Sequence, residues 1–99
     1  MKNPEKAAET VVKEIVREGE AGLPRLIYRL TAGKREGRHS YSVECAAAEP
    51  GVLYEDTARL PDVSSDPGTA LRVLEALARG GVTPYALTET AEALLGEDF

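Results

Sequence analysis

The sequence predicts an α+β domain with an N-terminal helix, a three-stranded antiparallel meander of order 1-2-3 and two C-terminal helices. Three observations support this fold class. Apolar residues recur at helical spacing near both ends of the chain, they alternate between residues 26 and 60, and short turns containing glycine or proline separate the alternating runs. Because the apolar stripes and the apolar sheet face must cover one another, we expect the helices to pack on one face of the sheet.

Residues 4–18 are expected to form the first helix. Asn3 is placed as its N-cap and Pro4 as its first helical residue. The apolar residues of this segment recur at i, i+3, i+4, i+7 and i+8, which is typical of one helical face: Ala8, Val11, Val12, Ile15 and Val16.

Three alternating runs predict the strands, the first beginning at Leu26, the second covering residues 39–46 and the third residues 52–60. Pairing Leu30 with Tyr41 and Leu26 with Cys45 places the apolar residues of the first two strands on one face. In the third strand, Val52, Tyr54, Ala58 and Leu60 are expected to face the core. Asp56 then also faces the core, and a β-bulge near Asp56 would correct the register, which the sequence leaves open.

Capping signals delimit two C-terminal helices. The first begins with Asp66 as N-cap and Pro67, and it ends at Gly80–Gly81. The second begins at Thr83–Pro84 and ends at Gly96. The apolar stripes expected to be buried are Leu71, Leu74, Leu77 and Ala78, with Val73 at the margin, and then Leu87, Ala91, Leu94 and Leu95.

The chain is expected to form a single domain over residues 1–99, with residues 1–3 and 96–99 loose. No segment resembles a secretory signal or the roughly 20 apolar residues of a membrane span. The single cysteine allows no internal disulfide. We therefore expect a cytoplasmic protein that does not engage a membrane.

Several stretches of the chain resemble a family of short, uncharacterised proteins from clostridial-type Gram-positive bacteria, a domain of unknown function. They are "YSVE" at residues 41–44, "DVSSD" at residues 62–66 and "ALRVLEALARGGVTPYALTETAEALL" at residues 70–95. The resemblance covers roughly residues 26–98 and implies a sheet meander followed by two helices. It implies no activity.

Charge is unevenly distributed along a chain whose net charge is −5. Residues 1–48 carry nine Lys or Arg and seven Glu, whereas residues 49–99 carry three Arg and ten Asp or Glu. The acidic second half argues against general nucleic-acid binding, which needs a basic face. Five basic residues nevertheless cluster at the predicted first hairpin and could contact a partner: Arg25, Arg29, Lys34, Arg35 and Arg38.

No catalytic, cofactor-binding or metal-binding residue is predicted. His39 and Cys45 are six positions apart on one strand, about 20 Å, so they cannot form a nucleophile–base pair. Cys45 falls on the apolar face, where free cysteine packs as a small hydrophobe. "DVSSDPG" begins like a calcium loop, but Pro67 replaces the required glycine and Val73 replaces the twelfth-position glutamate.

The sequence therefore favours a small non-enzymatic protein-interaction or regulatory domain. Its partner is unidentified and could be a second copy of the chain, joined through an edge of the sheet whose backbone groups are unpaired. An accessory to nucleic acid or a ribonucleoprotein, acting through the basic hairpin, is the alternative. An enzyme is a third reading, for which no residue gives positive support.

Overall fold

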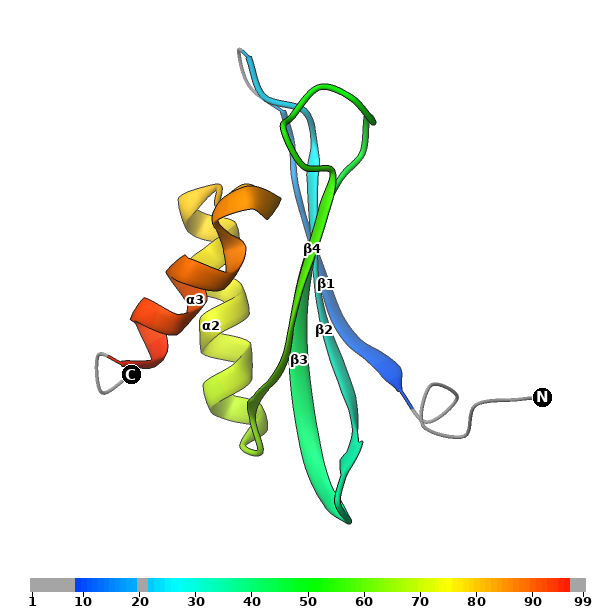
Figure 1. Cartoon of the computed structure of the whole chain (residues 1–99), viewed down its shortest axis with the longest axis vertical. Coiled ribbons are helices and arrows are strands. Elements are labelled where there is room, and N and C mark those ends of the chain that lie inside the picture. Colours follow the sequence, from blue (N-terminus) through cyan, green and yellow to red (C-terminus); the bar gives the residue numbers. More distant parts are fainter. Residues whose placement is uncertain (1–8, 20–21, 97–99) are drawn as a thin grey trace, which may run out of the picture.

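The computed structural model describes residues 9–19 and 22–96, which form two layers, a four-stranded antiparallel sheet and a helical layer on one of its faces (Figure 1). The strands follow one another in space in the order β1-β2-β3-β4. The elements, in chain order, are β1 (Thr10–Arg17), β2 (Leu26–Arg35), β3 (Arg38–Ala47), β4 (Thr57–Ser64), α2 (Pro67–Gly80), the 3₁₀ turn η1 (Pro84–Ala86) and α3 (Leu87–Leu95).

The predicted N-terminal helix is wrong, because residues 10–17 form strand β1 and the sheet has four strands instead of three. The predicted start at Asn3 and Pro4 lies outside the described residues. Five of the eight residues in TVVKEIVR are β-branched, which favours extended backbone. A β-bulge between Val11 and Lys13 adds one residue to the strand. This extra residue breaks the two-residue alternation, so the apolar residues of β1 fall at helical spacing.

The hairpin of β2 and β3 is tighter than predicted. Leu30 pairs with Val43 and Leu26 with Ala47, so the register is two residues away from the expected one. A shift of two residues keeps every side chain on its predicted face. The turn consists of Glu36 and Gly37, whose φ angles of 54° and 82° are those of a two-residue hairpin turn.

The last strand covers Thr57–Ser64 instead of the predicted residues 52–60. Residues 52–56 belong to the loop between β3 and β4, where the Asp56 carboxylate accepts a hydrogen bond from the Gly51 N–H at 3.1 Å. The predicted bulge at Asp56 is therefore wrong. The irregularity of β4 lies further along, where the register shifts between Tyr41 and Val43 of β3 and Asp62 has a φ of 55°.

The capping signals of α2 are confirmed. The Asp66 side chain accepts a hydrogen bond from the Thr69 N–H at 2.8 Å, and this bond lowers the pKa of the Asp66 carboxyl. At the other end Gly81 has a φ of 64°, and the N–H of Val82 reaches the Leu77 carbonyl at 3.1 Å.

The second predicted helix consists of η1 and α3, after which Gly96 acts as the C-cap. Residue 96 was expected to be loose together with the last residues, but it belongs to this cap. The other residues expected to be loose, 1–3 and 97–99, lie outside the described part of the chain.

The core lies between the helices and one face of the sheet. The sheet contributes Leu26, Tyr28, Leu30, Val43 and Cys45, and the helices contribute Ala70, Val73, Leu74, Leu77, Ala78, Leu87 and Ala91. The expected α2 stripe is confirmed except at its edge, because Val73 is fully buried and Leu71 only partly. In α3, Leu94 and Leu95 are half-buried.

Two side chains tie the sheet to the segment that follows α2. The Tyr28 hydroxyl donates a hydrogen bond to the Val82 carbonyl at 2.8 Å, and burial raises the pKa of Tyr28. The Arg17 guanidinium, at the end of β1, donates to the carbonyls of Ala78 and Arg79, each at 3.1 Å. A cation is favourable at the carbonyls of a helix C-terminus, so Arg17 fixes β1 to α2.

Candidate functional site

The open face of the sheet, turned away from the helices, carries a row of alternating charges. Each strand contributes one member, because Glu14 pairs with Arg29, Arg29 with Glu44 and Glu44 with Arg59 in the strand register. Arg29 lies 2.7 Å from Glu14 and 3.7 Å from Glu44, and Arg59 lies 3.0 Å from Glu44. Arg59 also forms an ion pair with Glu9, the residue directly before β1. The row therefore crosses the sheet from β1 to β4 and returns to the start of β1.

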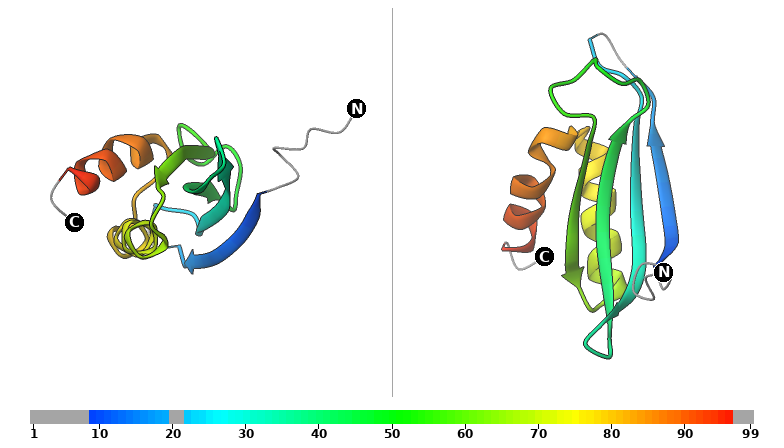
Figure 2. Two further views of the ribbon diagram at one scale, coloured as in Figure 1. Left: turned by 90° about the horizontal axis from the view of Figure 1, so that it is seen from below. Right: turned by 45° about the vertical axis from the view of Figure 1, so that its right-hand side comes forward.

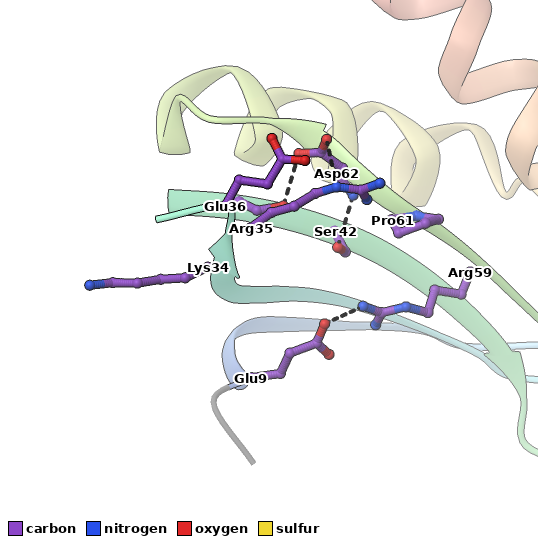
Figure 3. A pocket seen from close by; sticks show the side chains of 9 residues that line it. Glu9, Lys34, Arg35, Glu36, Ser42, Arg59, Pro61 and Asp62 are labelled. Carbon is purple, nitrogen blue, oxygen red and sulfur yellow. Dashed lines mark hydrogen bonds and ion pairs between the residues drawn. The ribbon is translucent and has the colours of Figure 1, made fainter. Parts of the chain in front are cut away.

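A polar hollow of about 460 Å³ lies beside this row, at the end of the sheet that holds the β2–β3 turn (Figure 3). Its charged lining is balanced, with three cations (Lys34, Arg35, Arg59) and three carboxylates (Glu9, Glu36, Asp62). Figure 3 shows Glu9 and Arg59 facing each other and Lys34 directed away from the hollow. The ion pairs within the lining therefore leave little unbalanced charge for a ligand.

Two serines at this hollow are bonded to the irregular part of β4. The Ser40 hydroxyl donates to the Asp62 carboxylate at 2.9 Å, and the Asp62 N–H donates to the Ser42 oxygen at 3.1 Å. These bonds hold Asp62 in its left-handed conformation. Thr31, directly opposite Ser42 on β2, is 6 % exposed, and its hydroxyl has no hydrogen-bond partner among the described residues.

The hollow has the polar groups to hold a small molecule but not the set needed for covalent catalysis. The serine hydroxyls bond an aspartate and a backbone amide, and no histidine is among the described residues that line the hollow. A nucleophilic serine needs a base within hydrogen-bond reach, oriented by a third group. Within residues 9–19 and 22–96, no group of three or more His, Cys, Asp or Glu side chains could hold a metal ion.

His39 and Cys45 both lie on β3, in different surroundings. His39 is exposed and pairs with Lys34 in the strand register. Cys45 is 1 % exposed, its thiol faces the Val82 carbonyl at 3.7 Å, and burial raises its pKa to about 12. The expected apolar surroundings of Cys45 are confirmed, and this thiol is unsuited to act as a nucleophile near neutral pH.

The five basic residues singled out in the sequence do not form one surface. Arg25 precedes β2 and lies 3.4 Å from Glu18, whereas Arg35 ends β2, roughly 30 Å away along an extended strand. Arg29 is engaged in the charge row. Only Lys34, Arg35 and Arg38 lie together at the β2–β3 turn, and Arg35 approaches Asp62 at 3.9 Å. The nucleic-acid alternative stays a prediction that rests on these three side chains.

Sequence reasoning missed the outer edge of β1. In the sheet of the described residues, β1 has a neighbour on one side only, and the right-hand view of Figure 2 shows it along the outer edge of the sheet. Val11, Val12 and Val16 on this strand are 53 %, 54 % and 46 % exposed. The high content of β-branched residues could have revealed this strand.

Sequence reasoning also missed an exposed aromatic pair. Tyr54 was expected to face the core, but it is 87 % exposed and contacts Tyr85, which is 69 % exposed. The two rings come from the β3–β4 loop and from η1, which are distant in the sequence. No sequence signal predicts this contact, because it depends on how the helical layer packs beside β4.

Comparisons with known proteins give no further assignment. No family model matches this chain, and no curated protein or solved structure matches it either. The resemblance to uncharacterised clostridial-type proteins therefore stays an expectation. No described helix has the length and apolar character to cross a membrane.

Proposed function

We propose that this chain is a protein-interaction domain that self-associates by antiparallel pairing of β1 with β1 of a second copy. The observation that supports this proposal is the outer edge of the eight-residue strand β1, which pairs with no second strand among the described residues and carries three exposed valines, Val11, Val12 and Val16. An unpaired edge presents a row of backbone N–H and C=O groups that can accept another strand. We place this function in the cytoplasm, where a lone thiol such as Cys45 stays reduced.

The charges of β1 do little to protect this edge. Natural sheets block exposed edges with charged side chains, lysine above all. Here Glu14 is bonded to Arg29 and Arg17 to the end of α2, so both are held on the faces of the sheet. Lys13, next to the bulge, is therefore the one charged residue of β1 that remains to protect the edge.

A second copy suits this edge better than an unrelated chain because the described part of the chain offers a single edge of this kind. The other edge of the sheet, β4, is irregular around Asp62, contains Pro61 and has α3 and η1 beside it (Figure 2). Pairing through one edge per molecule is isologous and closes at the dimer. The resulting eight-stranded sheet would cover the exposed valines of both copies.

Analytical ultracentrifugation over micromolar to millimolar concentrations tests the proposal. We expect a monomer–dimer equilibrium, and we expect Val12→Lys to weaken dimerisation at least tenfold because it places a second cation beside Lys13 on the edge. Val52→Lys is the matched control, since Val52 is 51 % exposed but lies in the β3–β4 loop. It should leave the equilibrium unchanged.

Amide hydrogen exchange locates the interface independently of the substitutions. Outward-facing amides of residues 10–17 should become protected as the concentration rises, while those of residues 57–64 should not. A single monomeric species throughout the concentration range contradicts the proposal. So does a dimer that Val12→Lys and Val52→Lys weaken equally.

A further inference from the structure

Tyr54 on the β3–β4 loop and Tyr85 in η1 form an aromatic corner at the surface. Figure 1 shows the β3–β4 loop at the end of the sheet opposite the β2–β3 turn. Their ring centroids are 5.3 Å apart and their planes meet at 88°. The chain has five aromatic residues in all, and these two remain 87 % and 69 % exposed. Edge-to-face contact is a preferred arrangement of aromatic pairs, and here it sets the planes of two exposed rings nearly perpendicular, so that they form a corner at the surface.

The corner opens onto a hollow of about 350 Å³ that also includes Leu53, Thr83 and Glu55. Leu53 is half-buried and packs against the core, which anchors the base of the loop. The hollow therefore combines two aromatic faces, an aliphatic side chain and one carboxylate.

The charge that lines the hollow at the aromatic corner is negative. Among the described residues, Glu55 lines it and no lysine or arginine does. Glu55 has no ion-pair partner in the part of the chain that the structure describes, and Glu49 on the same loop has none either. Asp56 accepts a hydrogen bond from Gly51 and stabilises the loop. Aromatic faces attract cations through their quadrupole, and an unpaired carboxylate adds to this attraction.

We propose that the aromatic corner binds a trimethylammonium group, the cation of choline and of trimethyllysine. The methyl groups of this cation project tetrahedrally, so they can contact both perpendicular ring faces at once. A guanidinium is planar and stacks on one face only, and an unmethylated ammonium is strongly hydrated and resists entry into an apolar corner. Aromatic faces are an established means of recognising quaternary ammonium ions, and a nearby carboxylate such as that of Glu55 adds Coulomb attraction. This binding site is independent of the self-association proposed for β1.

Titration with choline, followed through the NMR signals of the tyrosine rings and loop amides, tests this inference. We expect shifts confined to residues 49–56 and 83–86, with a Kd on the order of millimolar for a small exposed site. The neutral isostere 3,3-dimethylbutan-1-ol has the same shape without the charge and should bind at least tenfold more weakly. A second titration with a trimethyllysine peptide distinguishes a free small molecule from a modified protein as the source of the group.

Matched variants separate the role of the rings from the stability of the fold. Tyr54→Ala and Tyr85→Ala should each reduce choline binding at least fivefold, whereas Tyr54→Phe, which keeps the ring, should bind within twofold of the unmodified chain. Glu55→Gln should weaken binding of the cation but not of the isostere. Circular dichroism checks that each variant is folded.

If neither choline nor the trimethyllysine peptide shifts these signals at a ligand concentration about 100-fold above a millimolar Kd, the inference is overturned. It is also overturned if the neutral isostere binds as tightly as choline.

Discussion

The buried hydroxyl of Tyr28 provides a direct test of how the sheet is joined to the helical layer. Tyr28→Phe removes one oxygen and keeps the ring, so core packing is nearly unchanged. The Val82 carbonyl then loses a donor at 2.8 Å and retains the Cys45 thiol at 3.7 Å. Since sulfur is a weak donor, the carbonyl remains largely unsatisfied.

The expected loss in the free energy of unfolding is about 1–2 kcal/mol, between the net value of an ordinary hydrogen bond and the cost of a buried group without a partner. For a domain of this size that loss lowers Tm by roughly 5–15 °C. Urea denaturation followed by far-UV circular dichroism measures the loss. The control is Tyr85→Phe, because that tyrosine is 69 % exposed and should change stability by less than about 0.5 kcal/mol. Equal stability of the two variants would refute the role assigned to the Tyr28 hydroxyl.

Three further predictions concern the turn after α2, the buried thiol and the β2–β3 turn. Gly81→Ala should destabilise the fold by about 1–3 kcal/mol in urea denaturation, because the φ of Gly81 is +64° and the new Cβ would lie 3.0 Å from Arg17 Nε. Gly80→Ala is the control and should not destabilise the fold, because its new Cβ would lie 3.7 Å from the nearest atom, in the Val82 side chain. Burial raises the pKa of Cys45 from 9.0 to about 12, so the unfolded state loses the thiol proton first as pH rises. Between pH 9.0 and about 12, the free energy of unfolding of the unmodified chain should fall with rising pH by about 1.4 kcal/mol per unit more than that of Cys45→Ala. The same pH dependence in both proteins would contradict this prediction. Glu36→Asn should raise stability by about 0.5–1 kcal/mol, since asparagine tolerates the φ of 54° better than glutamate does; an unchanged urea midpoint would contradict it.

The C-terminal helices could be predicted because their signals are local. Asp66 and Pro67 begin α2, and Gly81 ends it through its own backbone conformation. The first strand could not be assigned from spacing alone, because the bulge between Val11 and Lys13 gives it the periodicity of a helix. Its β-branched composition favoured a strand, and that signal should have outweighed the spacing.

The limits of β4 depended on information that the sequence does not hold locally. Residues 52–56 have strand-like composition but form a loop, while Pro61 and Asp62, typical of a turn, lie within the strand. Hydrogen bonds from β3 hold this irregular segment, as when the Asp62 N–H bonds Ser42. Such partners become visible only when two distant segments are brought together.

The candidate sites were less predictable than the fold for the same reason. The basic residues are close in sequence, but a ten-residue strand separates Arg25 from Arg35. The tyrosines of the aromatic corner are distant in sequence, and they meet because η1 packs beside β4. Proximity in the chain thus grouped five basic residues of which the fold keeps three together, and it gave no sign of the two tyrosines that the fold brings into contact.

The row of charges across the open face implies an order of importance among its members. Arg29 stands between Glu14 and Glu44, so replacing it with a neutral residue leaves two carboxylates facing a vacant position. Glu14 lies at the end of the row, and its cross-strand partner is Arg29. Removing Glu14 therefore leaves Arg29 with its contact to Glu44. Interior members of such a chain of ions are therefore harder to replace than terminal ones, and drift of the sequence on this face should begin at its ends.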